Sequence, residues 1–103
     1  MSGAMNVLYR KKNYRIYGVS GGFIVHNTNY PFQNHHTHIN NFHTCKYLID
    51  LCIHESIPRQ KVSDYLLISL IKLSNSEDYK SKIEYKLSIN KNKRNRNRKN
   101  KSS

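Results

Sequence analysis

The sequence predicts an α+β fold in which a small N-terminal antiparallel β-meander of two or three strands packs on three α-helices. Two observations predict it. In the first third of the chain, Tyr, Val and Ile alternate with polar residues, which is typical of half-buried strands. From residue 42 onward, apolar residues recur at the three- and four-residue spacing of helices, and this spacing ends at Leu87.

The strands are expected at Val7–Lys12, Tyr14–Val19 and Phe23–Asn27, with His35–Ile39 as a further candidate. The turn Ser20-Gly21-Gly22 predicts a hairpin, because glycine readily takes the positive φ of tight turns. Side chains alternate between the two faces of a strand. We therefore expect Tyr14 and Ile16 on one face of the sheet and Arg15 and Tyr17 on the other.

Three helices are expected after the strands. Asn40 or Asn41 is a good N-cap for a helix over 42–54, and an apolar helix follows over 62–73. Ser76 caps a third, amphipathic helix, whose apolar stripe consists of Tyr79, Ile83 and Leu87.

The chain length of 103 residues predicts a single domain. Residues 1–4 precede a second methionine, Met5, and have the composition of an expression-tag remnant, so we expect the domain to span 5–87. Residues 88–103 are rich in Lys, Arg and Asn, contain no acidic residue, and include one apolar residue, Ile89. A segment of this composition cannot bury a core, so we expect a disordered basic tail.

The charge balance favours a polyanionic partner. The chain has 18 Lys and Arg against 6 Asp and Glu, a formal net charge of +12. AT-rich codons would also enrich Lys and Asn, so codon bias is a competing explanation. The phosphate-binding loop of nucleotide hydrolases and a dinucleotide-binding fingerprint are missing from the sequence. No apolar run approaches the length of a membrane span.

The leading interpretation is a small, non-catalytic protein that binds RNA or DNA. Lys and Arg neutralise phosphates, and aromatic side chains on a sheet stack on unpaired bases. The candidate residues are the hairpin's Arg10, Lys11, Lys12, Arg15 and Tyr17 and the tail's Arg94, Arg96, Arg98 and Lys99.

Histidines are concentrated in the middle of the chain, where His36, His38 and His43 surround the predicted strand-to-helix turn. Histidines held near a phosphate can act as general acid and base, so a His-dependent ribonuclease is a second alternative. The same three residues are candidate ligands of a metal ion, although the paired spacing of a zinc finger is missing. We expect no metal, no cofactor and no enzymatic activity.

The first alternative is a protein–protein interaction module, such as an accessory or inhibitor protein of a phage, a plasmid or a low-GC bacterium, which would suit a mobile genetic element. The two cysteines, Cys45 and Cys52, lie about 10 Å apart on one helix face, too far for a disulfide. Free, buried cysteines are typical of a reducing compartment, so we expect a cytoplasmic protein. Since the apolar runs are short, we expect no membrane partner.

Overall fold

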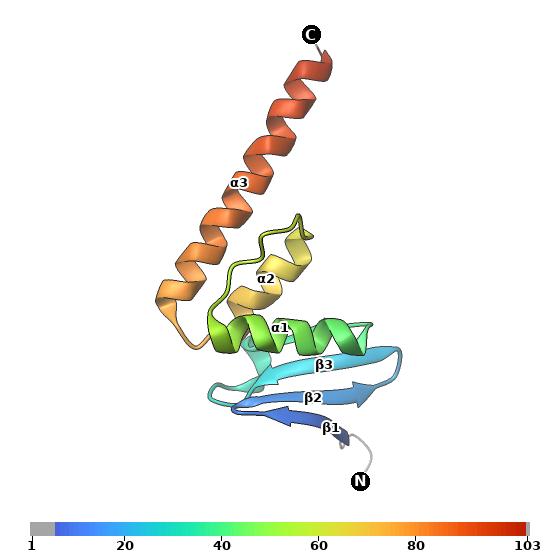
Figure 1. Ribbon diagram of the computed structural model, residues 1–103. Coiled ribbons are helices and arrows are strands. Elements are labelled where there is room, and N and C mark those ends of the chain that lie inside the picture. Colours follow the sequence, from blue (N-terminus) through green and yellow to red (C-terminus); the bar gives the residue numbers. More distant parts are fainter. Residues whose placement is uncertain (1–5, 103) are drawn as a thin grey trace.

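The computed structural model describes residues 6–102, with side chains as far as Lys91. A four-stranded antiparallel sheet is followed by three helices, which confirms the α+β class (Figure 1). The strands are β1 (Asn6–Lys11), β2 (Tyr14–Val19), β3 (Gly22–Asn27) and β4 (His36–Ile39), with the short 3-10 helix η1 (Phe32–Asn34) before β4. The helices are α1 (Phe42–His54), α2 (Asp64–Leu73) and α3 (Glu77–Ser102).

The sheet is a meander in the order β1-β2-β3-β4. It has four strands rather than the expected two or three, because the candidate segment before α1 does pair with β3, and it buries Thr37 and Ile39. Of the two turn glycines, Gly21 alone takes a positive φ, +84°. Gly22 begins β3 and has a different role: a Cβ there would lie 3.0 Å from the carbonyl oxygen of Ile39.

Each of the first two helices begins at a side-chain cap. The side chain of Asn41 accepts a hydrogen bond from the backbone N–H of Thr44 at the start of α1, and Ser63 accepts one from Leu66 at the start of α2. α1 ends at Glu55, whose left-handed φ of 50° turns the chain out of the helix. The predicted boundaries therefore agree closely with the structure.

The core lies between the sheet and the helices. α1 and α2 both pack on β3 and β4, and α3 packs on α2 (Figure 1). Tyr79 fastens the start of α3, because its ring is buried and its hydroxyl donates a hydrogen bond to the carbonyl of Ser56, at 2.7 Å. The fully buried aliphatic side chains include Ile16, Leu48, Ile49, Leu67, Leu70, Leu73 and Ile83. α2 is less enclosed than its apolar sequence predicts, since Tyr65 and Ile68 on its outer side are exposed.

The C-terminal segment differs from its prediction. The sequence predicts a disordered tail from residue 88, whereas the backbone of α3 continues as a helix to Ser102 and runs away from the sheet (Figure 1). Gly and Pro, which break helices, do not occur after Pro58, and Lys and Arg are good helix formers. The predicted expression-tag residues 1–4 lie outside the described residues.

Candidate functional site

The strand register divides the side chains of the sheet between two faces. Tyr14, Ile16 and Val25 point toward the helices and are buried. Their sequence neighbours point the other way, and α1, α2 and α3 leave that side uncovered (Figure 1). There Phe32 of η1 packs on His36, and Ile24 is 5% exposed beneath the neighbouring side chains. We call this side the open face and define it by Arg10, Arg15, Tyr17, His26, Phe32, His36 and His38. The predicted separation of Arg15 and Tyr17 from Tyr14 and Ile16 is confirmed.

Two arginines lie opposite each other on the open face. Arg10 on β1 is the direct cross-strand partner of Arg15 on β2. One guanidinium nitrogen of Arg15 donates to the carbonyl oxygens of Lys12 and Tyr14, each at 2.8 Å, which fixes the side chain over the β1–β2 turn. Like charges directly opposite on a sheet are destabilising. The pair therefore favours an anion between or beside the two side chains.

Next to the arginines, five rings form a continuous cluster, which we call the ring cluster: Tyr17, His26, Phe32, His36 and His38. Phe32 stacks on His36 with ring centroids 4.1 Å apart and planes within 9°. Edge contacts at 5.1 Å and 5.2 Å then connect Phe32 to His26 and His36 to His38. Tyr17 lies 6.5 Å from His26 at the arginine side of the cluster.

Backbone carbonyls orient two of these histidines. His26 Nε2 lies 3.1 Å from the carbonyl oxygen of Tyr30, and His36 Nδ1 lies 2.6 Å from that of Phe32. A carbonyl oxygen only accepts hydrogen bonds, so these two nitrogens carry the protons. In the neutral rings, His26 Nδ1 and His36 Nε2 are then acceptors. Within the described part of the chain, His26 Nδ1 is buried without a partner, so a hydrogen-bond donor is missing there.

Sequence reasoning missed Phe32 and His26. The alternation of β3 already places His26 on the same face as Arg15, which could have identified it. Phe32 belongs to η1, in the loop between β3 and β4. It contacts His36 only because this loop folds back over the sheet. No periodicity in the sequence indicates that contact.

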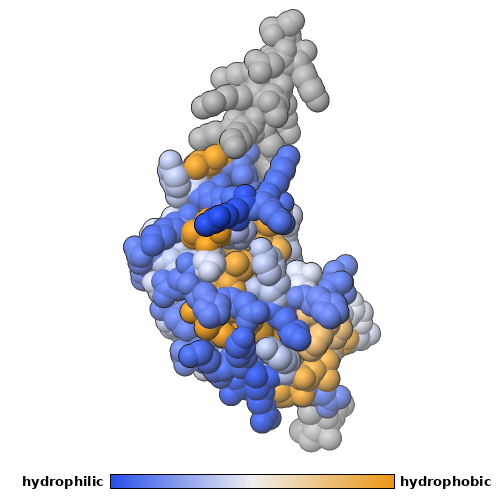
Figure 2. All heavy atoms as spheres, in the orientation of Figure 1, coloured by the Kyte–Doolittle hydropathy of each residue, from blue (hydrophilic) through white to orange (hydrophobic). Residues whose placement is uncertain are grey.

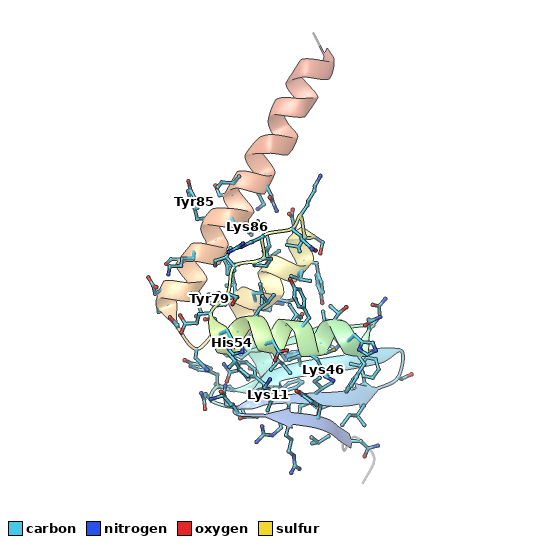
Figure 3. The ribbon with its side chains drawn as sticks, viewed as in Figure 1. Lys11, Lys46, His54, Tyr79, Tyr85 and Lys86 are labelled. Carbon is cyan, nitrogen blue, oxygen red and sulfur yellow. The ribbon has the colours of Figure 1, made fainter. Side chains whose placement is uncertain are left out.

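The other predicted cations of the hairpin lie elsewhere. Lys11 is on the helix-covered side and forms an ion pair with Asp50 of α1, with 2.8 Å between Nζ and Oδ1 (Figure 3). The hydrogen bond to Asp50 raises the pKa of Lys11. Lys12 is exposed in the β1–β2 turn, at a positive φ of 52°. Of the two, Lys12 contacts a residue of the open face, because its backbone carbonyl accepts a hydrogen bond from Arg15.

The candidate metal ligands do not form a cluster. His36 and His38 are in contact on the open face, whereas His43 is exposed in the first turn of α1. Among the residues that the structure describes, no three His, Cys, Asp or Glu side chains come together in a way that could hold a metal ion. Both cysteines are buried and free, as their spacing predicts.

The strands of the sheet carry basic residues and no acidic ones, so the sheet is a basic region of the domain. Asp50 is the first acidic residue of the chain, so no strand carries a carboxylate. The surface seen in Figure 2 is mostly hydrophilic, with apolar residues gathered beside the start of β1, where Val7 and Leu8 are exposed. The side chains of the predicted tail contacts Arg94, Arg96, Arg98 and Lys99 lie outside the described residues.

Within residues 6–102, no helix combines the length and the apolar character that crossing a bilayer requires. No protein-family model matches this chain, and neither a curated protein nor a solved structure matches it.

Proposed function

We propose that this protein binds single-stranded nucleic acid, RNA or DNA, on the open face of its sheet, without cleaving it. The observation that supports the proposal is the continuous ring cluster beside the Arg10–Arg15 pair on a face that lacks carboxylates. Bases stack on the accessible parts of these rings, of which His38 is exposed and the other four are half-buried, and the two guanidinium groups neutralise the backbone phosphates.

The preference for unpaired strands follows from the geometry of the rings. A duplex hides the faces of its bases, so it would meet this surface only through phosphates. The basic C-terminal segment adds sequence-independent attraction to any polyanion. Single strands are therefore expected to bind more tightly than a duplex of equal length.

The test is fluorescence anisotropy with labelled single-stranded RNA, single-stranded DNA and duplex DNA at about 0.15 M salt. The full chain is compared with the double variant Arg10→Ser/Tyr17→Ser. The matched control is Arg59→Ser/Tyr47→Ser, which removes the same residue types from exposed positions outside the open face.

Because stacking alone contributes about 1–3 kcal/mol per base, we expect the open-face variant to weaken single-strand binding by about tenfold or more. Its log–log salt slope should become shallower by about 0.7 for a lost phosphate contact. Equal binding by both double variants would contradict the proposal and leave only a generic charge effect. Intact RNA after incubation distinguishes binding from the ribonuclease alternative, which requires cleavage that His36→Ala or His38→Ala abolishes.

One feature favours the alternative function, binding of a protein partner. A hollow of about 640 Å³ beside α3 is lined by Ile57, Tyr85 and Ile89, and the Tyr85 side chain, 70% exposed, points away from the rest of the domain (Figure 3). Tyr85→Ser should leave nucleic-acid affinity unchanged. If it instead removes a cellular partner in co-purification, while the open-face variant keeps that partner, the alternative is supported.

A further inference from the structure

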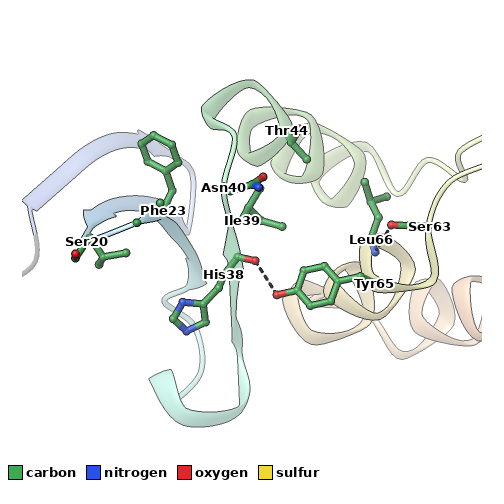
Figure 4. Close-up of a pocket in the computed structure, with 12 residues that line it drawn as sticks. Ser20, Phe23, His38, Ile39, Asn40, Thr44, Ser63, Tyr65 and Leu66 are labelled. Atoms are coloured by element: carbon green, nitrogen blue, oxygen red, sulfur yellow. Dashed lines mark hydrogen bonds between the residues drawn. The ribbon is translucent and has the colours of Figure 1, made fainter.

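A second concave feature lies at the end of the sheet, where β4 leads into α1. It is a hollow of about 420 Å³ between the β2–β3 turn, the end of β4 and the first turns of α1 and α2 (Figure 4). This volume lies within the range of small-molecule sites. Phe23, Ile39 and Leu66 form apolar parts of its wall.

Tyr65 of α2 provides a fixed aromatic ring in this wall. Its hydroxyl donates to the carbonyl oxygen of His38 at 2.7 Å (Figure 4). The same hydroxyl accepts a hydrogen bond from Thr37 Oγ1 at 3.3 Å. The side chain is nevertheless 51% exposed. A ring that is held in place and still accessible offers a stacking surface at little entropic cost.

Polar but uncharged groups complete the hollow. The Asn40 amide offers both donors and an acceptor, and the hydroxyl of Thr44 offers one of each (Figure 4). Of the described residues that line it, none is Lys, Arg, Asp or Glu. The hollow therefore suits a flat, neutral ring with hydrogen-bonding edges and is poorly suited to a phosphate.

The hollow and the open face share one residue, His38: its ring points away from Tyr65 and Thr44, whereas its backbone carbonyl meets the Tyr65 hydroxyl (Figure 4). The side chain of His38 ends the ring cluster, and the same residue lines the hollow. Because β4 is the edge strand of the sheet, a strand that crosses the ring cluster and passes over that edge at His38 comes to Tyr65, whose hydroxyl contacts the His38 carbonyl. The occupant is thus expected to belong to the strand bound on the sheet.

We propose that the hollow takes one unpaired nucleobase of the strand bound on the open face and gives that binding a base preference. This inference rests on the proposed function. Every base can stack on Tyr65, whereas hydrogen bonds with Asn40 and Thr44 distinguish one base edge from another.

The test compares the affinity of the full chain for RNA homopolymers of A, C and U of about eight nucleotides. Two variants change the hollow: Asn40→Ala removes the amide, and Thr44→Phe fills the space. The matched controls on α3, Asn90→Ala and Ser81→Phe, make the same kinds of change far from the sheet. Circular dichroism confirms that each variant is folded.

We expect the unaltered chain to prefer one homopolymer by about fivefold or more. Both hollow variants should lose that preference while binding the weakest homopolymer as before, and both controls should keep it. A titration of the unaltered chain with the nucleoside of the preferred base, followed by ¹H–¹⁵N NMR, should shift the signals of Asn40 and Tyr65.

The outcomes separate the two proposals. If the homopolymers bind equally, or if the hollow variants keep the preference, the base pocket is refuted while the open-face function stands. If a preference exists but the nucleoside moves neither NMR signal, the base is recognised elsewhere and the pocket is again refuted. If no homopolymer binds, the proposed function fails and the pocket proposal fails with it.

Discussion

The two faces of the sheet are formed by the same strands, but within the described residues the polar groups of one face have partners and several of those on the other face do not. On the covered face, Lys11 is paired with Asp50, and the side chain of Asn27 donates to the carbonyl of Leu73 at 2.8 Å. On the open face, Arg10 faces another cation, Arg15, and His26 Nδ1 lacks a partner among the described residues. The comparison teaches that the covered face is optimised for folding, whereas the open face retains cations that a ligand can neutralise; the buried His26 Nδ1 is not accessible to such a ligand.

Neighbouring residues on β2 give the sharpest test of this comparison. Ile16 is fully buried, so Ile16→Ala should lower the free energy of unfolding by about 2–5 kcal/mol. Tyr17→Ala, one residue later on the open face, should cost less than about 1 kcal/mol and should weaken nucleic-acid binding instead. Urea denaturation measures the first effect and anisotropy the second. Equal losses of stability would show that the open face is also part of the core.

Two polar residues on β3 extend the test. Asn27 is fully buried and bonds to Leu73, Asn13 and Asn75, so Asn27→Leu should cost about 1–3 kcal/mol by leaving these groups unpaired. His26→Leu should cost less than about 1 kcal/mol, because the loss of the exposed hydrogen bond to the Tyr30 carbonyl is offset by removal of a buried acceptor that has no partner in the described chain. Thermal unfolding of both variants gives the comparison, and a large loss in His26→Leu would contradict it.

The buried cysteines of α1, the helix that packs on the covered face, also predict how stability changes at alkaline pH. Burial raises the pKa of Cys45 to about 11 and that of Cys52 to about 12, from an ordinary value of 9.0. Above pH 9, the unfolded chain therefore binds fewer protons than the folded chain. The free energy of unfolding should then fall as pH rises, by up to about 1.4 kcal/mol per pH unit for each thiol.

Urea titrations between pH 8 and pH 10.5 measure this decline, and Cys52→Ala should make it less steep. Stability that stays constant over that interval would show that the thiols ionise equally in both states.

The smallest expected effect concerns the arginine pair. Arg10→Thr removes a like-charge contact, so it should raise the free energy of unfolding by about 0.2–1 kcal/mol while lowering affinity for single strands. Added phosphate should stabilise the unaltered chain more than the variant, as thermal unfolding can show. Loss of stability in Arg10→Thr would indicate that the arginines are structural.

Much of the fold was predictable because its signals are local. The caps Asn41 and Ser63 define helix starts, the turn at Gly21 defines the hairpin, and the alternation of β2 divides its side chains correctly. The fourth strand was harder to predict, because a segment as short as His36–Ile39 forms a strand only by pairing with β3.

The candidate site was predictable only in part. Arg10, Arg15 and Tyr17 were identified from the mixture of cations and aromatics on two strands. Lys11 was included with them because the sequence does not show that α1 brings Asp50 to it from 39 positions away. The contact of Phe32 with His36 depends on the path of a loop, which has no periodic signal.

By itself, the sequence determined the α+β class, the helix starts and the ends of α1 and α2, the free buried cysteines and the concentration of positive charge, because each depends on composition or on short-range spacing. Only the tertiary structure decided which face of the sheet stays open, which cations have carboxylate partners, and which rings meet. Those properties depend on contacts between residues far apart in the chain, and packing α1 and α2 on one face leaves the other free for a ligand.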